Sequence, residues 1–87
     1  MIDYESIGIG EVIENLRRRR RMTQEQLAEG ADLDRNTIGR IERDETIPSF
    51  STILNIALAL NVTPIQFSAE LEKMTNILEY YQQKDKG

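Results

Sequence analysis

Arginine is the residue type with the clearest capacity for chemistry in this chain, and it is concentrated in one segment. Residues 17–43 contain eight arginines and five acidic residues. Residues 1–16 contain four acidic residues and no base, and residues 44–87 contain six acidic residues and three lysines. Guanidinium groups bind phosphate and other planar acceptors through paired N–H donors. The cationic segment lies in a chain of net charge −4, so charge alone leaves two interpretations open: a surface for a polyanion, or solvated helix faces.

The missing residue types narrow the chemistry further. Cysteine and histidine are both absent, which excludes disulfides, thiol nucleophiles, imidazole bases and nearly all zinc or haem sites. A chain of 87 residues also has little room to enclose a water-excluding pocket around its carboxylates, lysines and hydroxyls. We expect a single domain over residues 1–87, with no enzymatic activity, no metal and no cofactor.

The N-terminus and the most apolar stretch bear on the location of the protein. The first five residues carry acids where a secretory signal needs basic residues, and Asn55 interrupts the apolar stretch 53–60. Neither segment is typical of a signal peptide or a membrane span. We therefore expect a cytoplasmic protein with no membrane partner.

Hydrophobic spacing and capping residues predict three helices in the first half of the chain. Apolar residues at intervals of three and four predict a first helix that runs toward Arg20: Ile9, Val12, Ile13 and Leu16. Thr23 and Gln26 have the spacing of a capping box and begin a second helix. A turn at residues 30–32 ends it, and Asp34 can cap a third helix.

Two further helices complete the prediction. Ser49 is the expected cap of a fourth helix, whose apolar face we assign to the following residues: Phe50, Ile53, Leu54, Ala57 and Leu58, widened by Ile56 and Leu60. Residues 63–66 combine a hydroxyl cap, a proline at the first helical position and a glutamine at the third. The fifth helix that starts there is expected to continue to about Tyr81, and residues 83–87 are expected to be a frayed tail.

The most informative pattern lies in residues 24–43, whose apolar positions suit two helices that cross at a steep angle. The inward-facing residues are Leu27, Ala31, Leu33, Ile38 and Ile41. The most telling strings are Thr23-Gln24-Glu25-Gln26-Leu27-Ala28, Thr37-Ile38-Gly39-Arg40-Ile41-Glu42-Arg43, and Pro48-Ser49 leading into Leu58-Ala59-Leu60-Asn61-Val62-Thr63. Through these strings the chain resembles the XRE-type helix-turn-helix family of lambdoid phage repressors and Cro over about residues 9–71. The resemblance implies an all-α, five-helix lambda-repressor-like DNA-binding domain, here with an extended C-terminal helix.

The resemblance also assigns roles to polar side chains. It implies that the third helix reads base edges in the major groove through Arg35, Asn36 and Arg40. Arginine can bond bidentately to guanine, and asparagine can do so to adenine. It implies contacts with DNA phosphates for a second set of residues: Gln24, Thr37, Arg43, Arg18 and Arg21.

Two structural expectations follow from the same resemblance. An arginine of the first helix pairs in this family with the glutamate that ends the third helix, which predicts an ion pair between Arg17 and Glu42. Three positions where the family often has glycine carry other residues here: Arg21, Asp32 and Asp44. Left-handed backbone at these positions would be costly for residues with a Cβ, although aspartate tolerates it better than arginine. The acids at 44–45 also make phosphate contacts in that loop doubtful.

The C-terminal part of the chain predicts an interface. Apolar residues recur there with heptad-like spacing: Phe67, Leu71, Met74, Leu78 and Tyr81. Domains of this family usually close near residue 71, so we expect the extension 72–82 to support a homodimer. The expected interface residues are Leu71, Met74, Ile77, Leu78 and Tyr81. Alternatively, Ile2, Tyr4 and Ile7 cover part of this stripe within the chain.

These features together predict a sequence-specific transcriptional regulator. It would read a palindromic operator in double-stranded DNA as a homodimer, with no small-molecule ligand evident. One alternative is an antitoxin-like autoregulator that binds a partner protein through its C-terminal helix. Another is a protein-interaction module that has lost DNA binding, which the acidic net charge favours.

Overall fold

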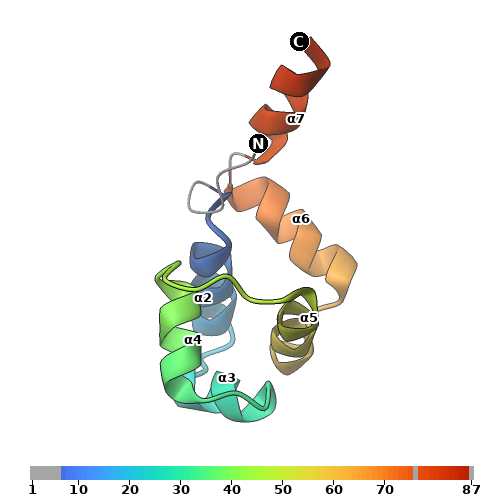
Figure 1. Cartoon of the computed structure of the whole chain (residues 1–87). Coiled ribbons are helices and arrows are strands. Elements are labelled where there is room, and N and C mark those ends of the chain that lie inside the picture. Colours follow the sequence, from blue (N-terminus) through green and yellow to red (C-terminus); the bar gives the residue numbers. More distant parts are fainter. Residues whose placement is uncertain (1–6, 76, 87) are drawn as a thin grey trace.

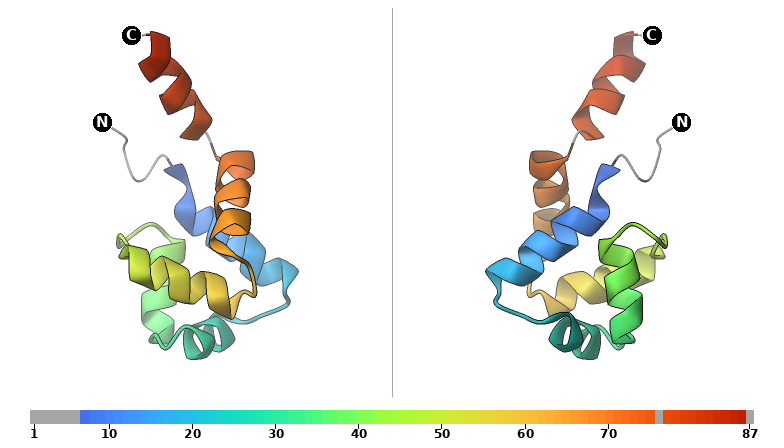
Figure 2. Two further views of the ribbon diagram at one scale, coloured as in Figure 1. Left: turned by 90° about the vertical axis from the view of Figure 1, so that its right-hand side faces the viewer. Right: turned by 90° about the vertical axis from the view of Figure 1, so that its left-hand side faces the viewer.

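The computed structural model describes residues 7–75 and 77–86, and the regular structure of these ranges consists of six α-helices. Their bounds are α2 Ile9–Arg19, α3 Gln24–Gly30, α4 Arg35–Glu42, α5 Phe50–Ala59, α6 Pro64–Met74 and α7 Ile77–Lys86. Helices α2 to α5 form the body, α6 runs beside it, and α7 projects beyond it (Figures 1 and 2). The predicted all-α class is confirmed, and α2 to α6 begin close to the five predicted starts.

Two capping boxes fix the starts of α3 and α6. Thr23 Oγ1 accepts a hydrogen bond from the Gln26 N–H (3.0 Å), and Gln26 Oε1 accepts one from the Thr23 N–H (2.8 Å). Thr63 and Gln66 make the same pair of bonds at α6 (3.1 and 2.8 Å). Asp34 occupies the N-cap position of α4, as predicted, but its side chain makes no capping bond. The two boxes satisfy backbone N–H groups that a helix start otherwise leaves unpaired.

Four residues other than glycine adopt left-handed backbone where helices end. They are Arg21 (φ 56°), Asp32 (φ 55°), Asp44 (φ 58°) and Asn61 (φ 58°). The first three stand at the positions where the family often has glycine, so these residues bear the cost of left-handed backbone described above for residues with a Cβ. Asn61, between α5 and α6, is a fourth such position that the sequence interpretation missed, and asparagine is among the residues that tolerate this conformation best.

The core is formed by apolar side chains of α2 to α6 and of the α3–α4 turn. Its buried members are Ile9, Val12, Ile13, Leu16, Leu27, Ala28, Ala31, Ile38, Ile41, Ile56, Ala57, Leu60 and Phe67. Ser49 caps α5 as predicted, accepting from the Thr52 N–H (3.2 Å). The predicted apolar face of α5 is partly wrong, because Phe50 and Leu58 are 73% and 76% exposed. Helix α5 is apolar on most sides, so hydrophobic period alone does not select the buried face.

The expected fifth helix does not continue to Tyr81. It ends at Met74, and Thr75 is extended (φ −126°, ψ 178°). The Thr75 hydroxyl donates to the Leu71 carbonyl and accepts from the Ile77 N–H (3.3 Å), so this side chain links the last turn of α6 to the start of α7. Helix α7 extends through Lys86, so residues 83–86 of the expected tail are helical in the structure, and Gly87 lies outside the described residues.

The break divides the C-terminal apolar stripe. Phe67 is buried, and Leu71 and Met74 pack half-buried against the body. Leu78 and Tyr81 lie on α7 and are exposed. Ile7 also packs against the core, whereas Ile2 and Tyr4 lie outside the described residues.

Within the described residues, no single helix has the length and hydropathy of a membrane span. Helices α5 and α6 meet that test only when taken together, and the chain bends by 98° between them.

Candidate nucleic-acid interface

The relative position of α3 and α4 follows from the short turn between them, residues 31–34. The Leu33 N–H donates to the Ala28 carbonyl (2.8 Å), and the Leu33 side chain packs against the core. Ile38 and Ile41 hold α4 to the core from its inner side. Because residues three apart on a helix share a face, the opposite face of α4 is presented to solvent.

That outer face carries the predicted base readers. Arg35, Asn36 and Arg40 are exposed, and none of the ion pairs in the described part of the chain involves Arg35 or Arg40. A recess of about 430 Å³ is lined by residues of α3 and α4 and the residue after α4: Gln24, Arg35, Asn36, Gly39, Arg40 and Arg43. This lining contains three guanidinium groups and no carboxylate, so it suits a ligand rich in acceptor oxygens and nitrogens.

Gly39 lies on the wall of this recess, where two side chains converge. A Cβ at Gly39 would lie 3.1 Å from Arg43 Nη1 and 3.7 Å from Gln24 Oε1. The missing side chain therefore leaves room for the Arg43 guanidinium against α4. Any larger residue would narrow the recess.

A buried polar cluster ties α4 to α2 and α3. Arg17 Nε donates to Glu42 Oε2 (2.7 Å) and Arg17 Nη2 to Glu42 Oε1 (3.1 Å). Their side chains are only 10% and 2% exposed, and Arg17 Nη1 also donates to the Met22 carbonyl (2.9 Å). The hydrogen bonds from Arg17 to Glu42 raise the pKa of Arg17 above its usual value, although burial acts in the opposite direction. The structure thus places Arg17 against Glu42, where the sequence predicts an ion pair.

Gln24 belongs to the same cluster. Its Nε2 donates to Glu42 Oε1 (3.0 Å). The carboxylate that binds Arg17 therefore also positions Gln24, which is predicted to contact phosphate. Gln24 Oε1 lies on the side of the recess. The sequence interpretation missed this bond because the resemblance assigned Gln24 only to phosphate, and no local pattern indicates a contact with Glu42, 18 positions away.

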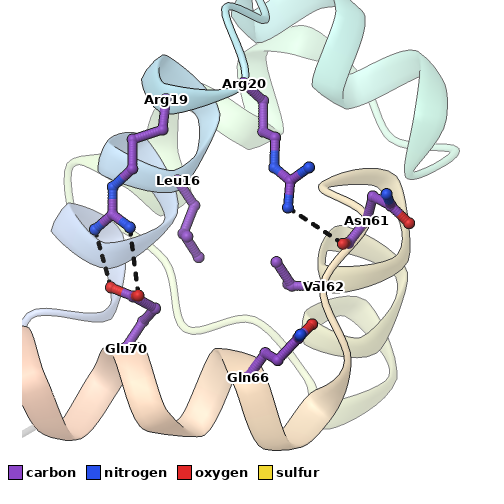
Figure 3. Close-up of a pocket in the computed structure, with 7 residues that line it drawn as sticks. All are labelled: Leu16, Arg19, Arg20, Asn61, Val62, Gln66 and Glu70. Atoms are coloured by element: carbon purple, nitrogen blue, oxygen red, sulfur yellow. Dashed lines mark hydrogen bonds and ion pairs between the residues drawn. The ribbon is translucent and has the colours of Figure 1, made fainter.

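Two exposed arginines of the Arg17–Arg21 run bind other parts of the chain, Arg19 on α6 and Arg20 at the turn between α5 and α6 (Figure 3). Arg19 makes two hydrogen bonds to Glu70, from Nη1 to Oε1 (3.3 Å) and from Nη2 to Oε2 (2.9 Å). Arg20 Nη2 donates to the Asn61 carbonyl (3.3 Å). The bonds from Arg19 lower the pKa of Glu70 and raise that of Arg19. These contacts join the end of α2 to α6 and to the α5–α6 turn across a recess of about 290 Å³ that Leu16 and Val62 also line.

The other predicted phosphate ligands are more dispersed. Arg18 is exposed and pairs with Glu14 one turn earlier (2.8 Å). Arg21 is exposed in the turn after α2, and Thr37 is half-buried in the first turn of α4. Of this group, only Gln24 and Arg43 lie with the base readers around the recess.

Arg43 has an acidic neighbour in the loop that follows α4. Arg43 Nε donates to Glu45 Oε2, and both side chains are exposed. The two residues, together with Arg40 and Asp44, line a second recess of about 700 Å³. Arg40 and Arg43 border both recesses.

An exposed apolar surface lies on α5 and α6, and we call it the α5–α6 surface. Its most exposed members are Phe50 (73%), Leu58 (76%) and Ile65 (82%). Leu58 lines a recess of about 360 Å³ that extends to Pro64, and Pro64 also borders the recess next to Ile65. The sequence interpretation missed this surface because it assigned Phe50 and Leu58 to the core.

The chain matches the helix-turn-helix family over residues 13–67. It is similar to the immunity repressor protein of Bacillus phage phi105, with 44% identity over 71 residues. The match covers 82% of this chain and 47% of the phage protein, so the chain spans about half the length of that relative.

Two solved structures of one restriction-modification controller protein share the fold. A mutant of the restriction-modification controller protein C.Esp1396I superposes with a TM-score of 0.79 at 31% identity, covering 88% of this chain and 97% of the controller. The tetramer of C.Esp1396I in complex with its natural 35 base-pair operator gives a TM-score of 0.76 at 30% identity, covering 83% of this chain and 95% of the controller.

Proposed function

This chain belongs to the helix-turn-helix family, and on that premise we propose that it is a transcriptional regulator that reads operator DNA through α4. In this proposal, Arg35, Asn36 and Arg40 contact base edges in the major groove. Gln24, Thr37, Arg43, Arg18 and Arg21 remain the proposed phosphate ligands. The proposed operator is palindromic and is bound by a homodimer.

The observation that carries the proposal is the cationic recess on α3 and α4. The recess gathers three guanidinium groups on the exposed side of α4, while Ile38 and Ile41 anchor the other side. The buried contact of Arg17 with Glu42 and the partly buried contact of Gln24 with Glu42 restrict rotation of α4 about its own axis. A rigid helix with donors on one face is what direct readout of base edges needs.

The relatives support the proposed class of protein, a transcriptional regulator. One is a phage immunity repressor, and another is a controller seen in complex with its operator. Both are consistent with a regulator, whereas the antitoxin-like and interaction-module alternatives find no specific support in the described residues.

Replacing Arg40 with alanine is expected to weaken specific binding by about 10- to 100-fold, because one bidentate base contact contributes about 1–3 kcal/mol of discrimination. The operator is first selected from a random duplex pool at about 100 mM salt. Affinities for selected and scrambled duplexes are then compared. Lys73→Ala, which removes an exposed positive charge from α6, is the control and should leave the ratio of the two affinities unchanged. Equal loss on both duplexes would show that Arg40 binds phosphate and does not read bases.

The proposed homodimer has two apolar surfaces available. Leu71 and Met74 of the sequence-predicted interface are half-buried against the body, while Leu78 and Tyr81 on α7 are exposed. Phe50, Leu58 and Ile65 of the α5–α6 surface are each more exposed than Leu78 or Tyr81, and they lie on α5 and α6, both of which contribute to the core. We therefore centre the proposed contact on the α5–α6 surface and retain α7 as an additional contributor.

Leu58→Asp is expected to convert the dimer to monomer, because the substitution would bury an unpaired carboxylate in the interface. Sedimentation equilibrium over a concentration series measures the change. Leu78→Asp is the matched variant on α7 and should raise the dimer dissociation constant less. If only Leu78→Asp dissociates the dimer, the interface predicted from the sequence is the correct one. A monomeric wild-type protein would contradict the homodimer.

A further inference from the structure

The loop after α4 is held in one conformation by three hydrogen bonds. The Asp44 N–H donates to the Ile41 carbonyl (3.1 Å) and the Glu45 N–H to the Arg40 carbonyl (2.9 Å), which is the bonding pattern of a Schellman helix end. Asp44 Oδ1 accepts from the Gly10 N–H at the start of α2 (3.1 Å). These bonds place the backbone of Glu45 beside the C-terminal end of α4.

From this position the Glu45 carboxylate binds the Arg43 guanidinium. Arg43 Nε donates to Glu45 Oε2, while Arg43 Nη1 lies 3.1 Å from the point where a Cβ of Gly39 would stand. The guanidinium group is therefore folded back along α4, between Gly39 and Glu45.

Stability does not account for this pair. The side chains of Arg43 and Glu45 are 61% and 51% exposed, and exposed ion pairs add little to the stability of a fold. A carboxylate beyond the C-terminal end of a helix also faces the negative end of the helix dipole. A role outside folding is the better explanation for an acid at this position.

The position of Arg43 indicates what that role is. Arg43 borders the cationic recess of the proposed readout surface and also the recess lined by Asp44 and Glu45. A DNA phosphate that approaches Arg43 meets a guanidinium that already has a carboxylate partner. Phosphate and carboxylate compete for the same planar set of donors.

We propose that Glu45 is an internal competitor that holds Arg43 away from DNA phosphates and so lowers the affinity for DNA. The inference rests on the proposed function and specifies how strongly the surface binds. Binding at Arg43 requires the loss of the Glu45 contact, so this arginine contributes less affinity than an unpaired arginine would. The chain thereby limits sequence-independent binding, while Arg35, Asn36 and Arg40 keep their capacity for base readout.

The test measures binding to a labelled random-sequence duplex of 35 base pairs, the length of the operator in the controller complex. Fluorescence anisotropy is recorded over about 50–200 mM salt, where phosphate contacts dominate. Glu45→Gln is expected to tighten binding about 5-fold at the lowest salt. It should also steepen the slope of log K against log salt by about 0.9, the value for one additional phosphate contact.

Two controls separate competition from general repulsion. Glu79→Gln makes the same change in net charge on α7 and should alter the affinity by less than about twofold, because salt screens distant charges. In an Arg43→Ala background, Glu45→Gln should have no effect, since the side chain it releases is gone.

Each outcome has a distinct meaning. A gain that persists without Arg43 shows simple repulsion and overturns the inference, as does wild-type binding with no gain in Glu45→Gln. If no variant binds any duplex, the proposed function itself fails and the inference fails with it.

Discussion

Replacing Gly10 with alanine is expected to destabilise the fold by about 3 kcal/mol or more, because the added Cβ has no room. It would lie 2.4 Å from the Glu42 carbonyl oxygen, 2.6 Å from the Ile41 carbonyl oxygen and 2.7 Å from Asp44 Oδ1. Two of these atoms belong to the backbone at the end of α4, so relief requires that α2 and α4 move apart. For a chain of this size, the loss lowers the melting temperature by more than about 10 °C.

Gly39→Ala is the matched control for this experiment. Gly39 is also helical, but its Cβ would meet the far end of the flexible Arg43 side chain, 3.1 Å away. Alanine is favoured over glycine inside a helix by about 1 kcal/mol, so Gly39→Ala should leave thermal stability unchanged or raise it. Thermal unfolding followed by far-UV circular dichroism measures both variants. A Gly10→Ala variant as stable as wild type would show that α2 and α4 do not meet so closely.

Glu42→Ala is expected to cost about 3–5 kcal/mol in the free energy of unfolding, because it leaves the Arg17 guanidinium buried without its carboxylate. It also removes the acceptor that holds Gln24 Nε2. Chemical denaturation in urea, followed by circular dichroism, measures the loss. Glu70→Ala, which removes the half-buried partner of the exposed Arg19, is the comparison and should have a smaller effect because the guanidinium it leaves unpaired stays in contact with water.

A second variant distinguishes buried charge from lost packing. Arg17→Met combined with Glu42→Leu removes both charges and keeps an apolar volume, so much of the stability lost in Glu42→Ala should return. DNA binding should not recover in parallel, because Gln24 still lacks its acceptor. If the double variant is as unstable as Glu42→Ala, the cost lies in packing and not in the unpaired guanidinium.

Features that depend on a few neighbouring residues could be predicted from the sequence. The capping boxes of Thr23 and Thr63 each form within four residues, and the spacing of threonine and glutamine predicts both. The outer face of α4 also follows from a local pattern, because Ile38 and Ile41 define its inner face.

Features that depend on distant contacts could not be predicted in this way. The bond between Arg19 and Glu70 joins residues 51 positions apart. The spacing of apolar residues did not identify the buried side of α5, because apolar residues lie around most of this helix. No glycine or proline marks the break between α6 and α7 at Thr75, so no local sequence signal predicts it. For the site, the sequence indicated which side chains could bind DNA, whereas the folded chain shows that Gln24 and Arg43 already have protein partners.

Helix α2 contacts the elements that carry both surfaces of the proposed dimer, the outer face of α4 and the α5–α6 surface. Through Arg17 and Gly10 it contacts α4 or the loop after it, and through Arg19 it contacts α6. In a symmetric dimer built on the α5–α6 surface, these contacts fix the distance from each recognition helix to the twofold axis. Two such helices can enter successive major grooves only when they are about 34 Å apart. If the proposed dimer forms in this way, α2 sets the half-site spacing, and changes at its contacts with α6 would alter which operator lengths the dimer accepts while the proposed base-reading side chains stay unchanged.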